Sequence, residues 1–283
     1  MDSQASFYPA PSGVNITICL NPKVGSTRWK MLMVQAKGIK VSPDVFQIHR
    51  TSVPWLTMLH GRPGYWRENG NEKNLRVMFV RNPYTRLLSG FLDKGVLWGT
   101  VYPIKPGHRE PYSATPAEFK RFIQALIARR DAGMEMDMHF ELQSRLCGGS
   151  AGYQYNFYLK VEEIDVWYVD FVSLLGIGHT AARGWKQYTT DGYACFFALR
   201  GKTCDETSEI IRNHYANPVD VSPNAENSGE PSWALTKTSH HAQGANRQIS
   251  TYYADVETLE LATGYLMQDI RRFGYPILRA GEL

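Results

Sequence analysis

A β-branched, apolar segment runs directly into a polar loop near the start of the chain, and this junction constrains the fold more than any other feature. The sequence reads "VNITICL" and then "NPKVGSTRWK" over residues 14–30. These letters predict a strand over residues 15–20, a turn, and a helix over residues 27–36. Backbone N–H groups at the start of such a helix bind phosphate-like anions. The junction therefore predicts a strand–loop–helix unit that holds an anion.

Strand and helix patterns alternate along the first two thirds of the chain. Further strands are expected at residues 45–49, 74–80 and 155–160, and further helices at 83–95 and 165–175. This alternation predicts an α/β fold, a single P-loop-type domain with a central parallel sheet flanked by helices. No repeat or domain boundary is visible, so residues 1–283 are expected to form one domain. Within it, residues 1–13 are expected to be flexible, and residues 217–245, rich in Pro, Asn, Ser and Gly, to form a long loop or lid.

The helix over residues 116–131 has the clearest boundaries. Thr115 is placed to cap it, Pro116 takes its first position, Glu118 completes a capping box, and Gly133 lies just past its end. A last helix is expected to end before Gly274.

Composition excludes several classes of protein. Hydrophobic residues make up 43% of the 283 positions and charged residues 20%, which are globular values, and the net charge of +4 suits an anionic ligand. Lys and Arg are scattered, so no nucleic-acid partner is expected. No run of 18 apolar residues occurs and the N-terminal segment lacks an apolar signal-peptide region, so neither a membrane span nor a signal peptide is predicted in this chain.

The four cysteines lack the spacing of a zinc site, so no metal site is predicted. Cys19, in the first expected strand, is predicted to be a core thiol. Cys195 and Cys204 bracket "FFALRGKT" and could close a hairpin disulfide in an oxidising compartment or remain reduced.

The loop after the first strand has residue types suited to an anion. Gly25 permits a tight turn, Ser26 and Thr27 offer hydroxyl groups, and Lys23 offers a positive charge. The order differs from that of a Walker A loop, in which the Lys follows the second Gly. The sequence therefore gives little support to a kinase or ATPase.

A second candidate element is "VMFVRNPYTRLLSGF". Arg81 follows an expected strand, Pro83 stops that strand, and Ser89 lies about two turns into the next helix. An Arg and a hydroxyl in these places could bind a second phosphate of the same ligand, because ligands of parallel sheets bind at the carboxyl ends of the strands. Alternatively, Arg81 and Arg86 are surface charges and Ser89 has no role. The spacing alone leaves both interpretations open.

Together, the two elements resemble the phosphate-binding motifs of sulfotransferases. "PKVGSTRWK" is similar to their 5′-phosphosulfate loop and "FVRNPYTRLLSGF" to their 3′-phosphate motif. The resemblance is strongest to the Golgi carbohydrate sulfotransferases of the chondroitin, dermatan and HNK-1 type. It extends to "MHFELQSRLCG", "YNFYLKVEEIDVWYVDFVSLLG" and "SHHAQGANRQISTYY…GYLMQDIRRFGY", so that it spans residues 16–275. Asn82 stands where the family usually has Asp or His, and Leu159 where it usually has Gly.

The resemblance implies transfer of a sulfuryl group from 3′-phosphoadenosine-5′-phosphosulfate to an acceptor hydroxyl, leaving 3′-phosphoadenosine-5′-phosphate, without a metal. Lys23 would stabilise the departing bridging oxygen, and Arg81 and Ser89 would hold the 3′-phosphate. The implied contacts of the 5′ end are Pro22, Lys23, Val24, Gly25, Ser26, Thr27, Arg28 and Trp29. Trp29 could pack near the adenine or belong to the core.

The acceptor hydroxyl needs a base that works near neutral pH, which favours histidine. His49 ends an expected strand on the same rim as the loop and is the first candidate, with His139 second. His240 and His241 lie in the expected lid and could instead line the nucleotide pocket.

A carbohydrate acceptor is the first expectation, and a small hydroxylated metabolite is the alternative. Two other classes are weighed against the sulfotransferase: a P-loop nucleotide kinase or NTPase, and a lectin or scaffold that has lost activity. The location would be the Golgi lumen if the chain is a trimmed family member and the cytoplasm otherwise. The oligomeric state is left open.

Overall fold

The structure, a computed structural model, describes residues 5–9, 15–26, 29–30, 33, 74–97, 112–149, 152, 154–176 and 240–281. Several expectations lie outside these residues. They are the strand at 45–49 with His49, the residues Thr27 and Arg28, the pair Cys195 and Cys204, and the part of the expected lid at 217–239.

Within the described residues, four strands form one sheet in the order β1-β2-β3-β4. They are β1 (Ala5–Pro9), β2 (Asn15–Leu20), β3 (Asn74–Val80) and β4 (Phe157–Lys160). Strands β2, β3 and β4 run parallel, whereas β1 pairs antiparallel with β2 at the edge. The prediction of an α/β chain with parallel strands is confirmed. Within residues 1–13, which were expected to be flexible, Ala5–Pro9 form strand β1, because pairing with β2 supplies backbone partners that the sequence of this short segment does not reveal.

Both faces of the central strands are buried, as is usual for parallel sheets. On one face, Ile18, Leu20 and Phe79 pack against helix α7 (Ile164–Leu174). On the other face, Met78 and Val80 pack against segments that come later in the chain. The strands are thus covered on both faces, and buried polar residues, Asn21 and Arg81, follow the carboxyl ends of β2 and β3.

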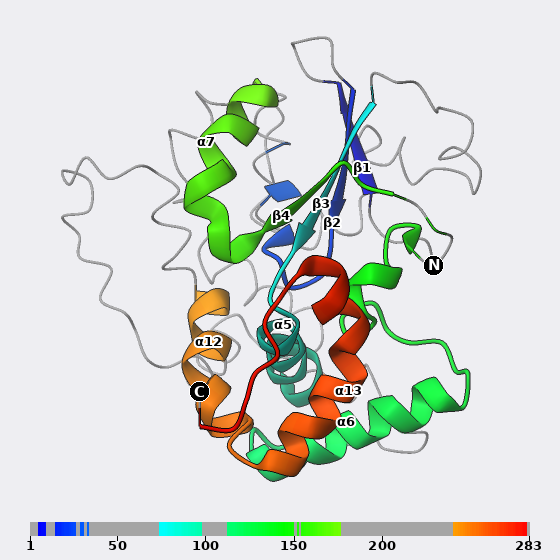
Figure 1. Cartoon of the computed structure of the whole chain (residues 1–283), viewed down its shortest axis with the longest axis vertical. Helices are drawn as coiled ribbons and strands as arrows, with labels where there is room; N and C mark the ends of the chain where they lie inside the picture. Colours follow the sequence, from blue (N-terminus) through cyan, green and yellow to red (C-terminus); the bar gives the residue numbers. More distant parts are fainter. Residues whose placement is uncertain are drawn as a thin grey trace, which may run out of the picture.

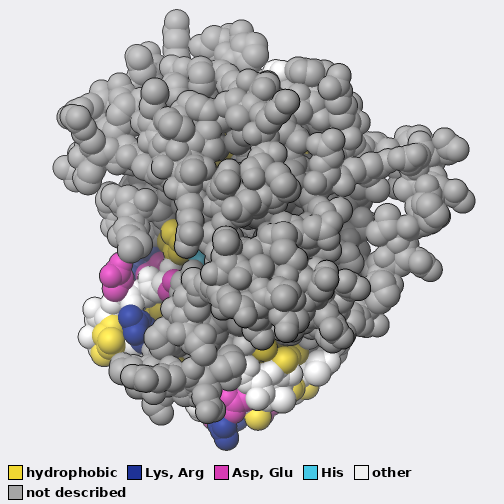
Figure 2. Space-filling model, turned by 180° about the vertical axis from the view of Figure 1, so that it is seen from behind, with side chains coloured by type: hydrophobic (Ala, Val, Ile, Leu, Met, Phe, Trp, Pro, Cys, Tyr) yellow, Lys and Arg dark blue, Asp and Glu magenta, His cyan; other side chains and the backbone are white. Residues whose placement is uncertain are grey.

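Most of the remaining helices gather beyond the carboxyl ends of β2 and β3, while α7 lies beside β4 (Figure 1). They are α5 (Pro83–Gly90), the π-helix η1 (Phe91–Leu97), α6 (Pro116–Asp131), η2 (Gln143–Arg145), α12 (His240–Tyr252) and α13 (Val256–Phe273). A short 3₁₀ turn, η4 (Val161–Glu163), joins β4 to α7. Aromatic side chains such as Phe91, Phe119 and Phe122 form the core of this helical layer. Seen from behind, the described side chains at its lower end mix both charges with apolar groups (Figure 2).

Helix boundaries mostly follow the predicted signals. The Thr115 hydroxyl accepts a hydrogen bond from the Glu118 N–H at 3.2 Å, so α6 begins as expected. The Glu118 carboxylate pairs with Arg121 and makes no reciprocal cap, so only half of the capping box forms. Helix α13 ends at Gly274, whose φ of 64° is the left-handed value that glycine adopts easily. The expectation of a loop through residue 245 is wrong, since α12 already begins at His240. None of the helices in the described ranges is long and apolar enough to cross a membrane.

The sequence predicted that Cys19 is a core thiol. This prediction is wrong, because Cys19 forms a disulfide with Cys147. The two cysteines lie 128 residues apart, and nothing in their spacing suggests that they pair. The bond joins β2 to the segment that follows η2. It therefore fixes η2 close to the end of the sheet.

We expect reduction of this disulfide to destabilise the protein. A cross-link over such a separation restricts the unfolded chain strongly and is worth about 4–5 kcal/mol in the chain-entropy model. Thermal unfolding should be measured with and without a thiol reductant for the native chain and for the double variant Cys19→Ala, Cys147→Ala. The reductant should lower the melting temperature of the native chain and leave the variant unchanged. An equal decrease in both would mean that another bond is responsible.

Candidate active site

The loop after β2 turns into a helix, as predicted. Lys23 and Gly25 have positive φ angles of 72° and 78°, and helical geometry begins at Ser26. The Trp29 N–H donates to the Gly25 carbonyl at 3.2 Å, which closes the first helical turn. Among the described residues, no atom lies within 4 Å of the position of a Cβ on Gly25, so the backbone faces open space on their side. We call residues 21–26 the anion loop, because alternating left-handed residues before a helix form the backbone pattern of anion sites.

Lys23 lies in this loop with a side chain only 9% exposed. Its ammonium group pairs with the Asp93 carboxylate of η1. Burial lowers the pKa of Lys23 to about 8, with Asp93 opposing the shift and Lys94 and Arg81 adding to it. Lys23 is therefore a cation at neutral pH whose charge depends on its carboxylate partner.

Arg81, directly after β3, is buried and reaches the anion loop. Its Nη1 donates to the Lys23 carbonyl at 3.1 Å, and its Nη2 donates to Oδ1 of Asn246 on α12 at 3.1 Å. Burial lowers the pKa of Arg81 to about 10, so it stays charged at neutral pH. The interpretation of Arg81 as a surface charge is therefore wrong.

The backbone of Arg81 is held by one side chain. The Gln143 amide accepts from the Arg81 N–H at 2.9 Å and donates to the Arg81 carbonyl at 2.8 Å. In turn, the fully buried Asp269 on α13 accepts from the backbone N–H groups of Gln143 and Ser144, at 2.7 and 2.8 Å. The position of Arg81 thus depends on α13, the last helix of the chain.

Helix α5 begins with the N-cap Asn82, which stands where the sequences that the chain resembles usually have Asp or His. The Asn82 side chain accepts from the backbone N–H groups of Tyr84 and Thr85, at 3.0 and 3.4 Å. Asn and Asp are equally good in this role, because each presents a side-chain oxygen. The same residue donates its own N–H to the Glu162 carboxylate at 2.8 Å.

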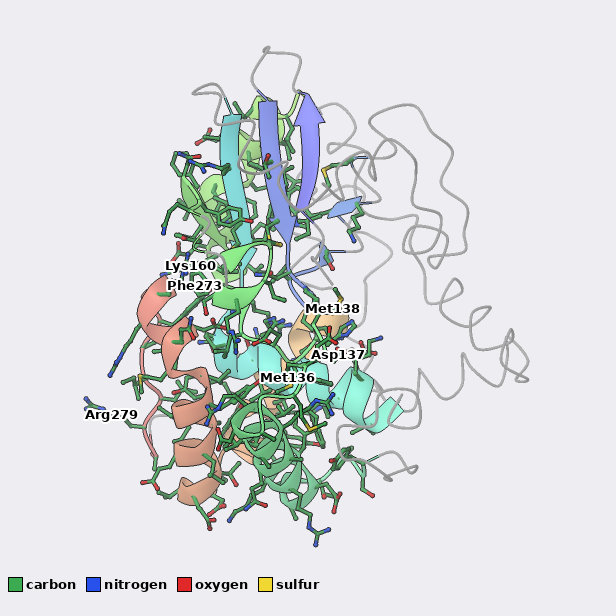
Figure 3. All side chains as sticks on the ribbon, turned by 90° about the vertical axis from the view of Figure 1, so that its right-hand side faces the viewer. Met136, Asp137, Met138, Lys160, Phe273 and Arg279 are labelled. Carbon is green, nitrogen blue, oxygen red and sulfur yellow. A yellow bond between two sulfur atoms is a disulfide. The ribbon has the colours of Figure 1, made fainter. Side chains whose placement is uncertain are left out.

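Arg86 joins the anion loop to the segment 137–141. It is buried, and its guanidinium donates to three carbonyl oxygens: Nε to Pro22 at 3.0 Å, Nη1 to Glu141 at 2.8 Å and Nη2 to Met138 at 3.0 Å. Pro22 belongs to the anion loop, and the other two belong to the segment 137–141. Figure 3 shows Asp137 and Met138 beside α5, just past the strands. We call this set of three bonds the Arg86 clamp.

Ser89 is buried at 6% exposure on the same helix. Residues three and four apart share a helix face, so Ser89 lies between Arg86 and Asp93, both of which contact the anion loop. Gly90 lies next to the segment 137–141, where a Cβ would be 3.0 Å from the His139 carbonyl. The segment that carries His139 therefore packs closely against α5 at Gly90, one residue after Ser89.

His139 forms a pair with Asp137. Its Nδ1 lies 2.7 Å from the Asp137 Oδ1, and its backbone N–H donates to the same oxygen at 2.8 Å. Burial lowers the pKa of His139, as do Lys94 and Lys23, while Asp137 opposes the shift. The charge of Lys23 thus acts on His139. With Asp137 on Nδ1, the proton-accepting nitrogen of a neutral ring is Nε2.

Trp29 lies in the core beside the anion loop. Its ring packs against Phe79, Phe171 and Trp167 with centroid distances of 4.9, 5.6 and 5.9 Å. Its expected contact with adenine stays a prediction. Pro22 and Val24 are also buried, and His240 and His241 form the first turn of α12.

The structure adds site residues that the sequence did not suggest, namely Arg86, Asp93, Asp137, Gln143 and Asn246. Asp93 could have been found from its place four residues after Ser89, on the same helical face. Asp137 lies two residues before its partner His139, whereas Arg86, Gln143 and Asn246 join segments far apart in the sequence. Among the described residues, no group of three or more His, Cys, Asp or Glu side chains could hold a metal ion.

Comparison with known proteins gives two matches. A sequence model of the sulfotransferase family matches residues 11–192. Carbohydrate sulfotransferase 10 of Danio rerio is 28% identical over 152 residues, which cover 50% of this chain and 37% of that protein. The chain therefore aligns with well under half of its relative's length. No solved structure matches.

The Arg86 clamp can be tested by a change that keeps the charge. Arg86→Lys should lower the free energy of unfolding by about 2–5 kcal/mol, because lysine cannot reach all three carbonyls and each buried carbonyl without a donor costs about 1–3 kcal/mol. Arg121→Lys, at a side chain 72% exposed, is the matched control and should change it by less than about 0.5 kcal/mol. Denaturant unfolding measures both. Equal stability of the two variants would show that the clamp does not hold the site together.

Proposed function

Because the chain belongs to the sulfotransferase family, we propose that it moves a sulfuryl group from 3′-phosphoadenosine-5′-phosphosulfate to a hydroxyl group of a carbohydrate. The observation that carries this proposal is the convergence of two buried cations. Lys23 and Arg81 follow neighbouring parallel strands and meet where Arg81 Nη1 bonds the Lys23 carbonyl at 3.1 Å. The donor is a nucleotide with anionic groups at two separate positions, and two separate cations fit it.

The residues of the site divide between the two ends of the donor. The anion loop, with Lys23, Gly25 and Ser26, would hold the 5′-phosphosulfate, and the open space beside Gly25 leaves its backbone accessible. Thr27 and Arg28 belong to the same proposed contact set. Arg81 and Ser89 would hold the 3′-phosphate. Charge-assisted hydrogen bonds of this kind are the strong ones in proteins.

The proposed transfer is a single displacement. The acceptor oxygen forms a bond to sulfur while the bond from sulfur to the bridging oxygen breaks. The acceptor proton passes to Nε2 of His139, and Lys23 stabilises the electron pair left on the bridging oxygen. A positioned base contributes about 10²–10⁴-fold to such reactions, and fixed positive charges contribute more. Of the two histidines proposed as bases, His139 is supported by its Nδ1 contact with Asp137, which leaves Nε2 to accept a proton. His49 lies outside the described residues.

The proposal of a carbohydrate acceptor is supported by the name of the relative from Danio rerio. The alternative, a small hydroxylated metabolite, uses the same donor site and differs only in the acceptor. A nucleotide kinase or NTPase would require magnesium. An experiment on donor and acceptor therefore separates all three.

The first test measures binding and transfer together. Calorimetric titration with adenosine 3′,5′-bisphosphate in the presence of EDTA should show specific binding, and labelled donor should pass its sulfuryl group to a member of a panel of glycans. Turnover only on small hydroxylated compounds would overturn the carbohydrate acceptor. A magnesium requirement, or absence of binding, would overturn the sulfotransferase mechanism.

Within that assay, Lys23→Met should reduce kcat by about 10²–10³-fold, because the departing oxygen loses its cation. Lys120→Met is the matched control, since Lys120 also pairs with carboxylates, Asp255 and Glu257, but lies between α6 and α13 away from the site. The control should keep normal turnover. Comparable losses in both variants would remove Lys23 from the chemistry.

The pH dependence of kcat/KM for the donor should be bell-shaped. His139 must be neutral to accept a proton, so activity should rise with pH through its pKa, which lies below the ordinary value of 6.5. Lys23 must be protonated, so activity should fall as pH rises through about 8. Replacing Lys23 by Arg should remove the alkaline limb, because Arg keeps its proton throughout this range. An alkaline limb that persists in Lys23→Arg would assign it to another group.

A further inference from the structure

Asp93 faces the ammonium group that the proposed reaction uses. The pair is secluded, with exposed fractions of 9% for the Lys23 side chain and 13% for the Asp93 side chain. Lys94, the next residue of η1, also lies 3.3 Å from the same Asp93 oxygen. One carboxylate is thus shared by two lysines.

Lys23 needs such a partner before any ligand arrives. Arg81 approaches it from the end of β3, Lys94 from η1 and His139 from the segment 137–141, so in the described part of the chain its other charged neighbours are cations or a group that can become one. A buried charge without a partner is costly, and a lysine in that position gives up its proton. Asp93 opposes that loss.

The pair must nevertheless open for the donor. A phosphosulfate placed against Lys23 would also stand close to the Asp93 carboxylate, and like charges at short range repel. Lys94 resolves this conflict, because it already lies within ion-pair distance of Asp93 and can remain its partner.

We propose that Asp93 is the counter-ion that Lys23 exchanges for the donor, keeping Lys23 charged in the empty site and passing to Lys94 when the donor binds. This inference rests on the proposed function. In this role Asp93 is a positioning residue, since Asp93 acts through Lys23. The inference also predicts that donor binding by the native chain requires little uptake of protons.

The experiment is calorimetric titration with adenosine 3′,5′-bisphosphate between pH 6 and 9, in buffers of different ionisation enthalpy, which report the protons taken up. At pH 7.5, binding of the ligand to the Asp93→Asn variant should be accompanied by uptake of more protons than binding to the native chain, because Lys23 without its counter-ion is more often neutral. At pH 6, where Lys23 is protonated in both, the variant should bind about tenfold more tightly. This advantage should shrink as pH rises. Asp255→Asn, which alters another Lys–Asp pair, is the matched control and should behave like the native chain.

Lys94→Met provides a second and opposite test that does not depend on the folding of the first variant. It removes the lysine that lies 3.3 Å from Asp93, so binding should weaken by about tenfold and proton uptake should not exceed that of the native chain. Native-like proton uptake and pH dependence in Asp93→Asn, or unchanged affinity in Lys94→Met, would overturn the counter-ion role while leaving the proposed function intact. No binding by the native chain would overturn the proposed function, and this inference with it.

Discussion

The described site depends on one guanidinium group. Arg86 donates to carbonyls of the anion loop and of the segment 137–141, and no backbone pairing joins these two segments directly. Arginine suits the task because its planar head carries donors in fixed directions and keeps its charge even where burial lowers its pKa. The bonds bring a lysine and a histidine from distant parts of the sequence into electrostatic range of each other. The relative position of Lys23 and His139 is thus set by α5, a helix that carries neither of them.

Each of three site residues is held by a polar partner. Lys23 has Asp93, His139 has Asp137, and the backbone of Arg81 is enclosed by the Gln143 amide. Asp269 is fully buried and accepts hydrogen bonds from backbone N–H groups, so its charge has a structural role. The cations that face the anion loop outnumber the carboxylates there, which is the balance expected of a site that receives a multiply charged anion.

The strands, the capped helix α6 and the turn at Gly25 could be predicted, because each rests on local patterns of apolar spacing and turn residues. Lys23, Arg81 and Ser89 could be proposed because the two motifs that contain them resemble those of a known family. The partners of these residues could not. Arg86 looks like an exposed helix residue until the fold buries it, and Cys147 gives no sign of Cys19. Such contacts depend on tertiary packing, which sequence periodicity does not encode. The strand β1 was missed because its pairing comes entirely from a neighbour.

The bond from Arg81 to Asn246 joins residues 165 positions apart, and Asp269 lies further still toward the C-terminus. The sequence match to the family ends at residue 192, before either of them. During synthesis on the ribosome, β2 and β3 emerge early, but the supports of Arg81 arrive only with the last helices. The two-cation arrangement can therefore form only after α12 and α13 have been synthesised. A chain that stops at the end of the family match would keep the motifs of the site and lose the helices that hold Arg81 in place.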